Sequence, residues 1–236
     1  MRQPVPDQLL HMLRSVAIAI GDDLRERLVF VGGCTTILFI TDPITFDDVR
    51  ATDDVDVIVD LAGYGGWAQL QDQLREKGFS ESPDDDVICR MRHGGLKVDF
   101  MPDDPDILGF SNRWYARGIE TAISCELSDS LTIKRLASPL FIATKLEAYN
   151  GRGNNDPLGS HDLEDILIVI DGREELVDEV TKADRDVRDY ISEQISNLLN
   201  HYDFDSFLEG NIRGPEGRAE IVRDRLEALC SLNCDV

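Results

Sequence analysis

Apolar and polar residues alternate most strictly at residues 54–61, where the chain reads DVDVIVDL. Neighbouring side chains in a strand point to opposite faces, so this alternation predicts a β-strand with its valines buried. Shorter apolar runs predict further strands at LVFVGG, VICRMRH, LKVDFMP, TAISCEL and LTIKRLA. The glycine pair at 94–95, between two of these runs, indicates a hairpin.

Apolar residues at spacings of three and four predict a different architecture in the second half of the chain. The predicted helices are 7–19, 67–77, 138–150, 161–170, 174–182, 186–200 and 218–232, with CTTILFIT as a further helix after Gly33. Ser138-Pro139 and Ser160 are typical helix starts. We therefore expect an α/β (α+β) protein, with a mixed twisted sheet flanked by helices in residues 1–137 and a helical C-terminal domain in 138–236.

Composition limits the classes of protein that this chain can belong to. Its 236 residues are 42% hydrophobic, which predicts a packed globular protein. No uninterrupted apolar run is long enough to span a membrane, and we read the N-terminus as part of the fold. The five scattered cysteines suggest neither a disulfide framework nor a zinc site and favour a reduced, cytoplasmic setting. The net charge of −22 argues against broad nucleic-acid binding, although a small basic patch remains compatible with it.

Three acidic residues suggest a metal site. Asp54 and Asp56 are two residues apart in the clearest strand, so their carboxylates share one face. Like charges at this separation repel unless a cation intervenes, and Mg²⁺ prefers oxygen ligands. Asp99 lies between two apolar residues of a later strand and is suited to be a third ligand. The alternative is a set of solvated acids on an edge strand.

A glycine pair precedes the acidic strand by about twenty residues. Gly32 and Gly33 end an apolar strand and precede the expected helix at CTTILFIT. Free N–H groups at a helix start attract phosphate, and glycine allows close approach to the backbone. A glycine pair by itself more often marks only a tight turn.

Together, Gly32-Gly33, Thr52-x-Asp54-x-Asp56 and the later Asp99 resemble the DNA polymerase beta-like nucleotidyltransferase superfamily. The segments RATDDVDVIVDL and VDF are similar to the sequence motifs around that family's metal site. The resemblance implies that Asp54, Asp56 and Asp99 are catalytic and hold Mg²⁺ or Mn²⁺, while Gly32, Gly33 and Thr52 contact a nucleoside triphosphate. In such a site, the metal ions promote in-line displacement at phosphorus.

The second half of the chain narrows the resemblance to the AbiEii-type nucleotidyltransferase toxins of type IV toxin–antitoxin systems and their bacterial relatives. Lys145 and Arg152 are followed by Asp162 and Asp165 in SHDLEDI, and the likeness covers about residues 28–170. It implies that these four residues also bind nucleotide. It further implies an RNA acceptor, such as a tRNA end, and an antitoxin protein as a partner.

Lys145 is notable even without the resemblance, because it falls within the apolar stripe of helix 138–150. A lysine in such a stripe needs a partner or a function. It can reach a triphosphate, extend along the surface to solvent, or pair with a nearby acid. Arg50 and Thr52 flank the acidic strand, where they can line a nucleotide pocket.

Three functions are compatible with these residues. The first is an RNA-directed, toxin-like nucleotidyltransferase, which the resemblance supports and the acidic charge opposes. The second is a nucleotidyltransferase that modifies a small molecule such as an antibiotic, since an acidic surface suits cationic substrates. The third is a non-catalytic acidic binding protein that retains only the fold, although all three acids are present.

Overall fold

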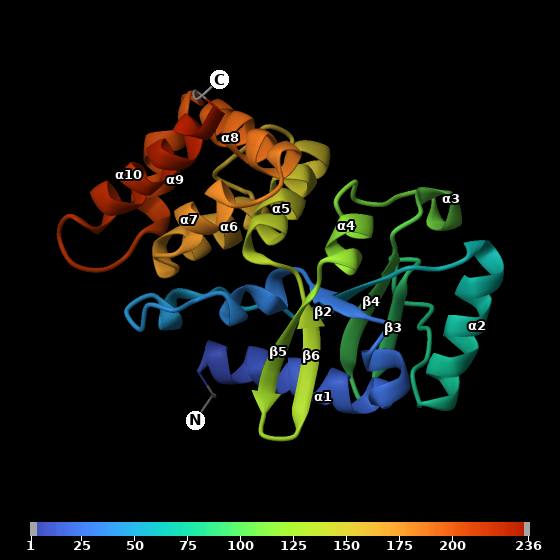
Figure 1. Ribbon diagram of the computed structural model, residues 1–236. Helices are drawn as coiled ribbons and strands as arrows, with labels where there is room; N and C mark the ends of the chain where they lie inside the picture. Colours follow the sequence, from blue (N-terminus) through green and yellow to red (C-terminus); the bar gives the residue numbers. More distant parts are fainter. Residues whose placement is uncertain (1–3, 234–236) are drawn as a thin grey trace. The chain divides into compact units, whose positions relative to one another are not determined.

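The computed structural model describes residues 4–233, which divide into two compact units (Figure 1). The sheet unit contains residues 4–35 and 51–137, and the helical unit contains 36–50 and 138–233. The change of architecture after residue 137 was predicted from the sequence. The assignment of all of 1–137 to one domain differs from the structure, because 36–50 belongs to the helical unit.

The sheet unit is built on a six-stranded mixed sheet in the order β3-β4-β2-β1-β6-β5. Two neighbouring pairs, β2 with β4 and β1 with β6, are parallel, and the other three pairs are antiparallel. The mixed sheet is the one expected from the alternating segments. The strands are β1 (Val29–Val31), β2 (Asp54–Val59), β3 (Arg90–His93), β4 (Leu96–Pro102), β5 (Ile123–Ser128) and β6 (Leu131–Arg135).

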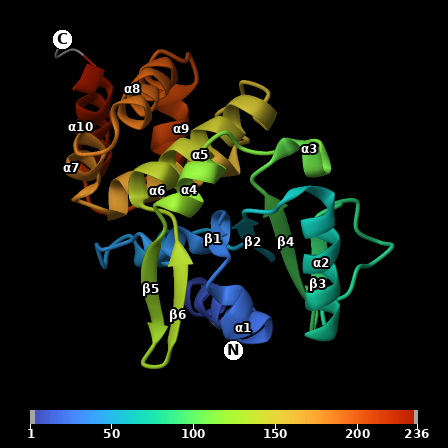
Figure 2. The same ribbon diagram turned by 45° about the vertical axis from the view of Figure 1, so that its right-hand side comes forward.

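Helix α1 (Val5–Arg25) packs along this sheet and contacts β2, β4, β5 and β6 (Figure 2). Its side chains at Leu9, Leu13, Val16 and Ile20 are fully buried, which the helical spacing of these residues requires. The remaining helices of the unit are α2 (Gly63–Glu76), α3 (Pro105–Leu108) and α4 (Tyr115–Glu120).

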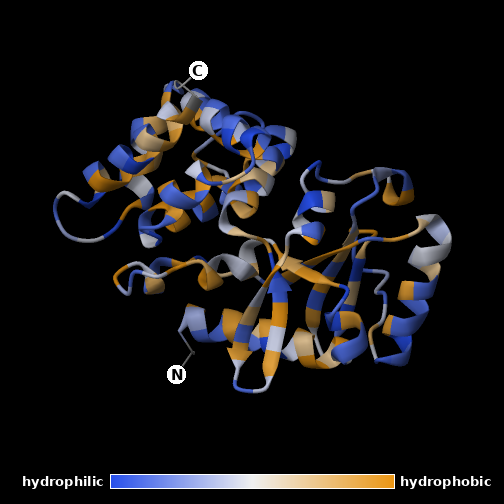
Figure 3. Cartoon of the chain, in the orientation of Figure 1, coloured by the Kyte–Doolittle hydropathy of each residue, from blue (hydrophilic) through white to orange (hydrophobic). Residues whose placement is uncertain are grey.

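The helical unit is organised around α6 (His161–Gly172), in which residues 162, 163 and 165–172 are buried and residues 166–170 form an apolar run (Figure 3). A helix that is buried all round lies at the centre of its unit, and α6 contacts α5, α9 and α10. The Ser160 side chain accepts a hydrogen bond from the Leu163 N–H, as expected for its cap. The other helices are α5 (Ser138–Arg152), α7 (Leu176–Thr181), α8 (Arg185–Leu199), α9 (Phe204–Asn211) and α10 (Arg218–Cys230).

The segment 36–50 is held to the helical unit by hydrogen bonds at the end of α6. The Gly172 carbonyl accepts bonds from the N–H groups of Thr41 and Asp42, at 2.8 and 2.9 Å. Arg218 donates to the Asp42 carboxylate at 2.6 Å. A side chain at Gly172 would overlap Thr45 and Ile40, so glycine allows this close approach.

One expected element differs in the structure, and three α-helices within the described residues were not expected. In place of the longer α-helix predicted at CTTILFIT, the structure has a six-residue 3-10 helix, η1 (Gly33–Leu38), which begins one residue earlier. The Thr35 hydroxyl donates to the Gly32 carbonyl at 2.8 Å and stabilises this tight turn. So short a 3-10 helix does not supply the α-helix start that was expected to bind phosphate at Gly32-Gly33. The α-helices that the spacing of apolar residues left unassigned are α3, α4 and α9.

Within residues 4–233, no helix is both long and apolar enough to cross a membrane. The cysteines in this range, Cys34, Cys89, Cys125 and Cys230, all have free thiols, while Cys234 lies outside the described residues.

Candidate functional site: a carboxylate site on the sheet and an ion-pair cluster among the helices

The carboxylate site lies on two parallel neighbouring strands, β2 and β4. Asp54 and Asp56 alternate with Val55 and Val57, whose side chains are fully buried. The register of the two strands places Asp99 directly opposite Asp56. Parallel neighbours lie about 4.8 Å apart, so this register brings together the three acids singled out in the sequence.

Two side chains bind the carboxylates directly. The Thr52 hydroxyl donates to Oδ1 of Asp54 at 2.7 Å. Arg90 forms two parallel hydrogen bonds to Asp99, of 2.7 and 2.8 Å, and Nη2 of the same guanidinium donates to Oδ2 of Asp54 at 2.9 Å. The Asp54 and Asp99 carboxylates are therefore both within hydrogen-bonding distance of one nitrogen atom. The bonds to Asp99 raise the pKa of Arg90 above its already high ordinary value, so this residue carries a full positive charge.

Gly32 completes this side of the site by lying against the Asp56 carboxyl group. Its φ angle is +73°, and a side chain at this position would overlap the Oδ2, Cγ and Cβ atoms of Asp56. Glycine is thus required at this position both by the backbone conformation and by the close approach of Asp56. Gly33 follows as the buried first residue of η1.

We expect Gly32→Ala to destabilise the sheet unit more than Gly63→Ala. Gly63 has a similar φ of +67° but open space where a side chain would lie, so its variant measures the backbone strain of roughly 1–2 kcal/mol alone. Gly32→Ala has a comparable backbone strain and, in addition, the cost of displacing the Asp56 side chain. Urea unfolding monitored by tryptophan fluorescence measures both, because both tryptophans, Trp67 and Trp114, lie in the sheet unit. Equal losses in the two variants would contradict the contact between Gly32 and Asp56.

The chemistry of this site fits a hard divalent cation. Three carboxylates offer the oxygen ligands that Mg²⁺ and Mn²⁺ prefer, and the Arg90 guanidinium lies where Asp54 and Asp99 converge, which shows that the site accommodates positive charge. Across residues 4–233, however, no three His, Cys, Asp or Glu side chains are already arranged as a metal-binding group. Residues suited to hold the metal are Asp54, Asp56 and Asp99.

Two buried cysteines lie near these acids and do not act as nucleophiles. Burial, followed by the negative charges of Asp56 and Asp54, raises the pKa of Cys34 well above its usual range. Burial and the charges of Asp99 and Asp56 similarly raise the pKa of Cys89 to about 12. Because the thiolate is the reactive form, both thiols stay protonated and inert at neutral pH.

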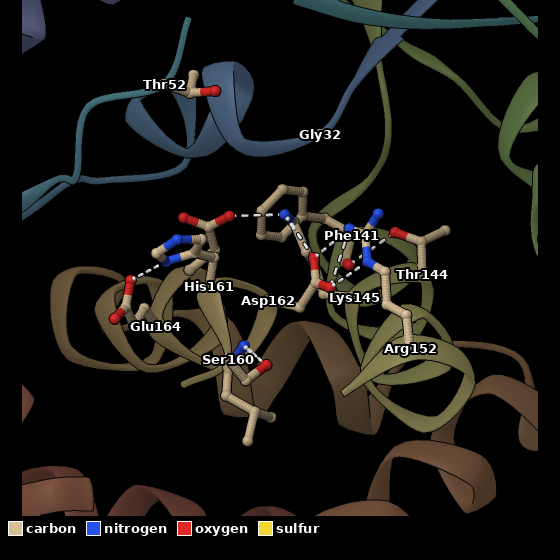
Figure 4. A network of polar contacts seen from close by, with 12 residues as sticks. Gly32, Thr52, Phe141, Thr144, Lys145, Arg152, Ser160, His161, Asp162 and Glu164 are labelled. Carbon is tan, nitrogen blue, oxygen red and sulfur yellow. Dashed lines mark hydrogen bonds and ion pairs between the residues drawn. The ribbon is translucent and has the colours of Figure 1, made fainter. Parts of the chain in front are cut away.

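The second group of predicted residues forms an ion-pair cluster inside the helical unit (Figure 4). The Lys145 ammonium on α5 donates to Asp162 at 3.1 Å and to Asp165 at 2.6 Å, both on α6. Arg152 binds the Asp162 carboxylate with two hydrogen bonds of 3.0 Å. Arg50 binds Asp165 in the same bidentate way, at 2.8 and 2.9 Å.

Burial makes this cluster important for stability. Lys145 is only 6% exposed and Asp165 is fully buried, so the suggestion that Lys145 extends to solvent is wrong and the pairing with nearby acids is observed. Burial alone lowers the pKa of Lys145, but the charges of Asp165 and Asp162 outweigh it and raise this pKa above its ordinary value. Burial likewise raises the pKa of Asp162, and the charge of Lys145 and the bond from Arg152 reverse that effect, so the net pKa is lowered.

The lowered pKa of Asp162 predicts a specific loss of stability in acid. A carboxyl group whose pKa is lower in the folded than in the unfolded protein stabilises the fold above the unfolded pKa of about 4. That contribution disappears as the pH falls through the lower, folded value. We therefore expect the difference in unfolding free energy between wild type and Asp162→Asn to be constant from about pH 5 to pH 7 and to narrow below about pH 4. Urea titrations at each pH measure this difference in unfolding free energy. A difference that stays constant down to pH 2 would show that it does not arise from the charge of Asp162.

The structure thus places the predicted residues in two groups, each within its own unit. Gly32, Gly33, Thr52, Asp54, Asp56 and Asp99 belong to the sheet unit, and Lys145, Arg152, Asp162 and Asp165 belong to the helical unit. The sequence interpretation missed Arg90, and it placed Arg50 beside the acidic strand, whereas Arg50 binds Asp165 in the helical unit. Binding of nucleotide by the helical group stays a prediction.

The chain matches no protein-family model, and no significant match to it was found among curated proteins.

Proposed function

We propose that the carboxylate site is the centre of a metal-dependent nucleotidyltransferase, which moves a nucleoside monophosphate from a nucleoside triphosphate to an acceptor hydroxyl. The observation that carries this proposal is the register of β2 and β4, which sets Asp99 opposite Asp56 and two residue pairs along the ladder from Asp54. Two of the three acids share a single guanidinium, that of Arg90, so the three carboxylates together carry a net negative charge that a divalent cation would balance. They are suited to a site that attracts Mg²⁺ and phosphate groups together.

In this proposal the residues of the chain have distinct tasks. Bound divalent metal would supply the positive charge that stabilises the phosphoryl group and the departing pyrophosphate. Asp54, Asp56 and Asp99 hold that charge in place, and Thr52 orients Asp54 through its hydroxyl. Gly32 lets the backbone come close to Asp56, leaving no side chain in the way of a phosphate.

The acceptor in this proposal is either RNA or a small molecule, and one experiment distinguishes the two. The protein is incubated with Mg²⁺ and each α-labelled nucleoside triphosphate, with total RNA in one series and hydroxylated cationic small molecules in the other. Transfer requires label on the acceptor and release of pyrophosphate. Label on RNA supports a toxin-like enzyme, and label on a small molecule supports the acceptor favoured by the net charge of −22.

The control is Asp56→Asn, which must lose the label in either series. Absence of transfer with all four triphosphates and both acceptor types would contradict the proposal. It would favour a non-catalytic acidic binding protein, especially if triphosphate with Mg²⁺ also failed to stabilise the protein against unfolding.

A further inference from the structure

The cation that the carboxylate site already contains is Arg90, and this inference about it rests on the proposed metal site. Arg90 on β3 is paired with Asp99 on β4 across the hairpin. Its guanidinium forms both bonds available in a bidentate pair with Asp99 and extends a third bond to Asp54. The Arg90 and Asp99 side chains are 13% and 11% exposed, so the contact is largely shielded from water.

The same oxygen atoms are the ones that a divalent ion would need. Both oxygens of Asp99 and Oδ2 of Asp54 accept bonds from Arg90, while Oδ1 of Asp54 accepts the Thr52 hydroxyl. A metal ion that binds Asp54 and Asp99 together must approach the position of Nη2. Two cations that share ligands repel strongly at such short range, most of all where water is excluded.

We propose that Arg90 is a built-in counter-ion of this site, which holds Asp54 and Asp99 together before metal binds and then competes with divalent metal for their oxygens. Arg90 therefore sets the metal affinity of the site. The guanidinium cannot lose its proton to remove this competition, because arginine stays charged in proteins. Metal binding must instead displace the side chain from Asp54, and from at least one oxygen of Asp99.

The test is a titration with Mn²⁺ alone, followed by electron paramagnetic resonance of the free ion at 25 °C, on protein shown to be folded by circular dichroism. Arg90→Gln removes the competing charge and is expected to lower the Kd for Mn²⁺ by about tenfold or more. Arg92→Gln is the matched control. Arg92 lies on the same strand two residues away and also forms a bidentate pair, at 2.7 Å, but its partner is Asp85, which is not one of the three acids. The Kd of the Arg92→Gln variant for Mn²⁺ should equal that of wild type.

A second pair of variants keeps the test decisive if Arg90→Gln fails to fold, since that variant leaves Asp99 largely buried without its partner. The double variant Arg90→Gln/Asp99→Asn removes both charges of the pair. It should bind Mn²⁺ more tightly than Asp99→Asn alone, in which Arg90 still competes at Asp54.

The possible results separate this inference from the proposed function. If Arg90→Gln, or the double variant against its parent, binds Mn²⁺ equally or more weakly, competition by Arg90 is overturned and the metal site stands. If neither wild type nor Arg90→Gln binds Mn²⁺, or if wild type and Asp56→Asn bind it equally well, the metal site itself is overturned together with this inference.

Discussion

Replacing Asp56 with asparagine is expected to abolish nucleotidyl transfer, with a loss of at least about a thousandfold in kcat. Asp56 is opposite Asp99 and lies against Gly32, so no other acid of the site can take its place by a change of side-chain rotamer. Asparagine has nearly the same shape and retains one oxygen, but it lacks the charge that holds a divalent cation. Transfer of label from the preferred triphosphate measures the effect.

The same variant should fold normally and respond less to metal. Removing one of three crowded acids relieves repulsion, so Asp56→Asn should be at least as stable as wild type in the presence of a chelator. Wild type should gain about 2.7 kcal/mol at a metal concentration of 100 times Kd, and the variant much less. Asp60→Asn is the control, because Asp60 follows directly after the end of β2 and is exposed. Equal gains in all three proteins would place the metal elsewhere.

Much of the sheet was predictable because its signals are local. The alternation in DVDVIVDL depends only on strand geometry, and β2 covers six of its eight residues. The glycine pair at 94–95 likewise fixes the hairpin, since a two-residue turn leaves little freedom of register. That register pairs His93 with Leu96 and, three steps further on, Arg90 with Asp99. Counting back from the turn would therefore have identified Arg90 as the partner of Asp99.

The parts that were not predictable depend on contacts between distant residues. Nothing in the sequence of 36–50 shows that Asp42 binds Arg218, a residue 176 positions away, or that its backbone bonds to Gly172. The spacing in CTTILFIT is compatible with an α-helix, but the turn is fixed by the Thr35 hydroxyl and the positive φ of Gly32. Tertiary contacts override local helix preference in such short segments.

The two groups of candidate residues illustrate the same limit in the site. The stripe position of Lys145 correctly indicated a lysine that needs a partner, and the acids at 162 and 165 were identified independently. The sequence could not show that these residues bind one another, because α5 and α6 are separated by a loop of Gly, Asn and Pro residues whose path is not encoded by periodicity. Arg50 was missed as a member of this cluster because it binds Asp165, a residue 115 positions away in the sequence.

Lys145→Ala should therefore destabilise the helical unit by about 3–5 kcal/mol, far more than an exposed lysine would. The variant leaves the fully buried Asp165 and the nearly buried Asp162 without the ammonium that lies between them. Arg152 is hydrogen-bonded to Asp162 and Arg50 to Asp165, whereas Lys145 is bonded to both acids, and the Arg152 side chain is 73% exposed. Thermal and urea unfolding followed by far-ultraviolet circular dichroism measures the loss.

Lys182→Ala is the control for this prediction. The Lys182 side chain is exposed and its ammonium lies 4.0 Å from the exposed Asp178 carboxylate four residues earlier, so no measurable change in stability is expected. A Lys145→Ala variant as stable as this control would show that the cluster does not stabilise the fold.

Titration of the folded Lys145→Ala variant with triphosphate and with nucleoside then tests the second role proposed for Lys145, which is contact with the phosphate groups of a nucleotide. A contact to phosphate predicts weaker binding of triphosphate only, whereas equal affinity in wild type and variant would leave Lys145 with the structural role alone. In that case the motif around Lys145 would no longer support placing this chain with the toxin-like enzymes.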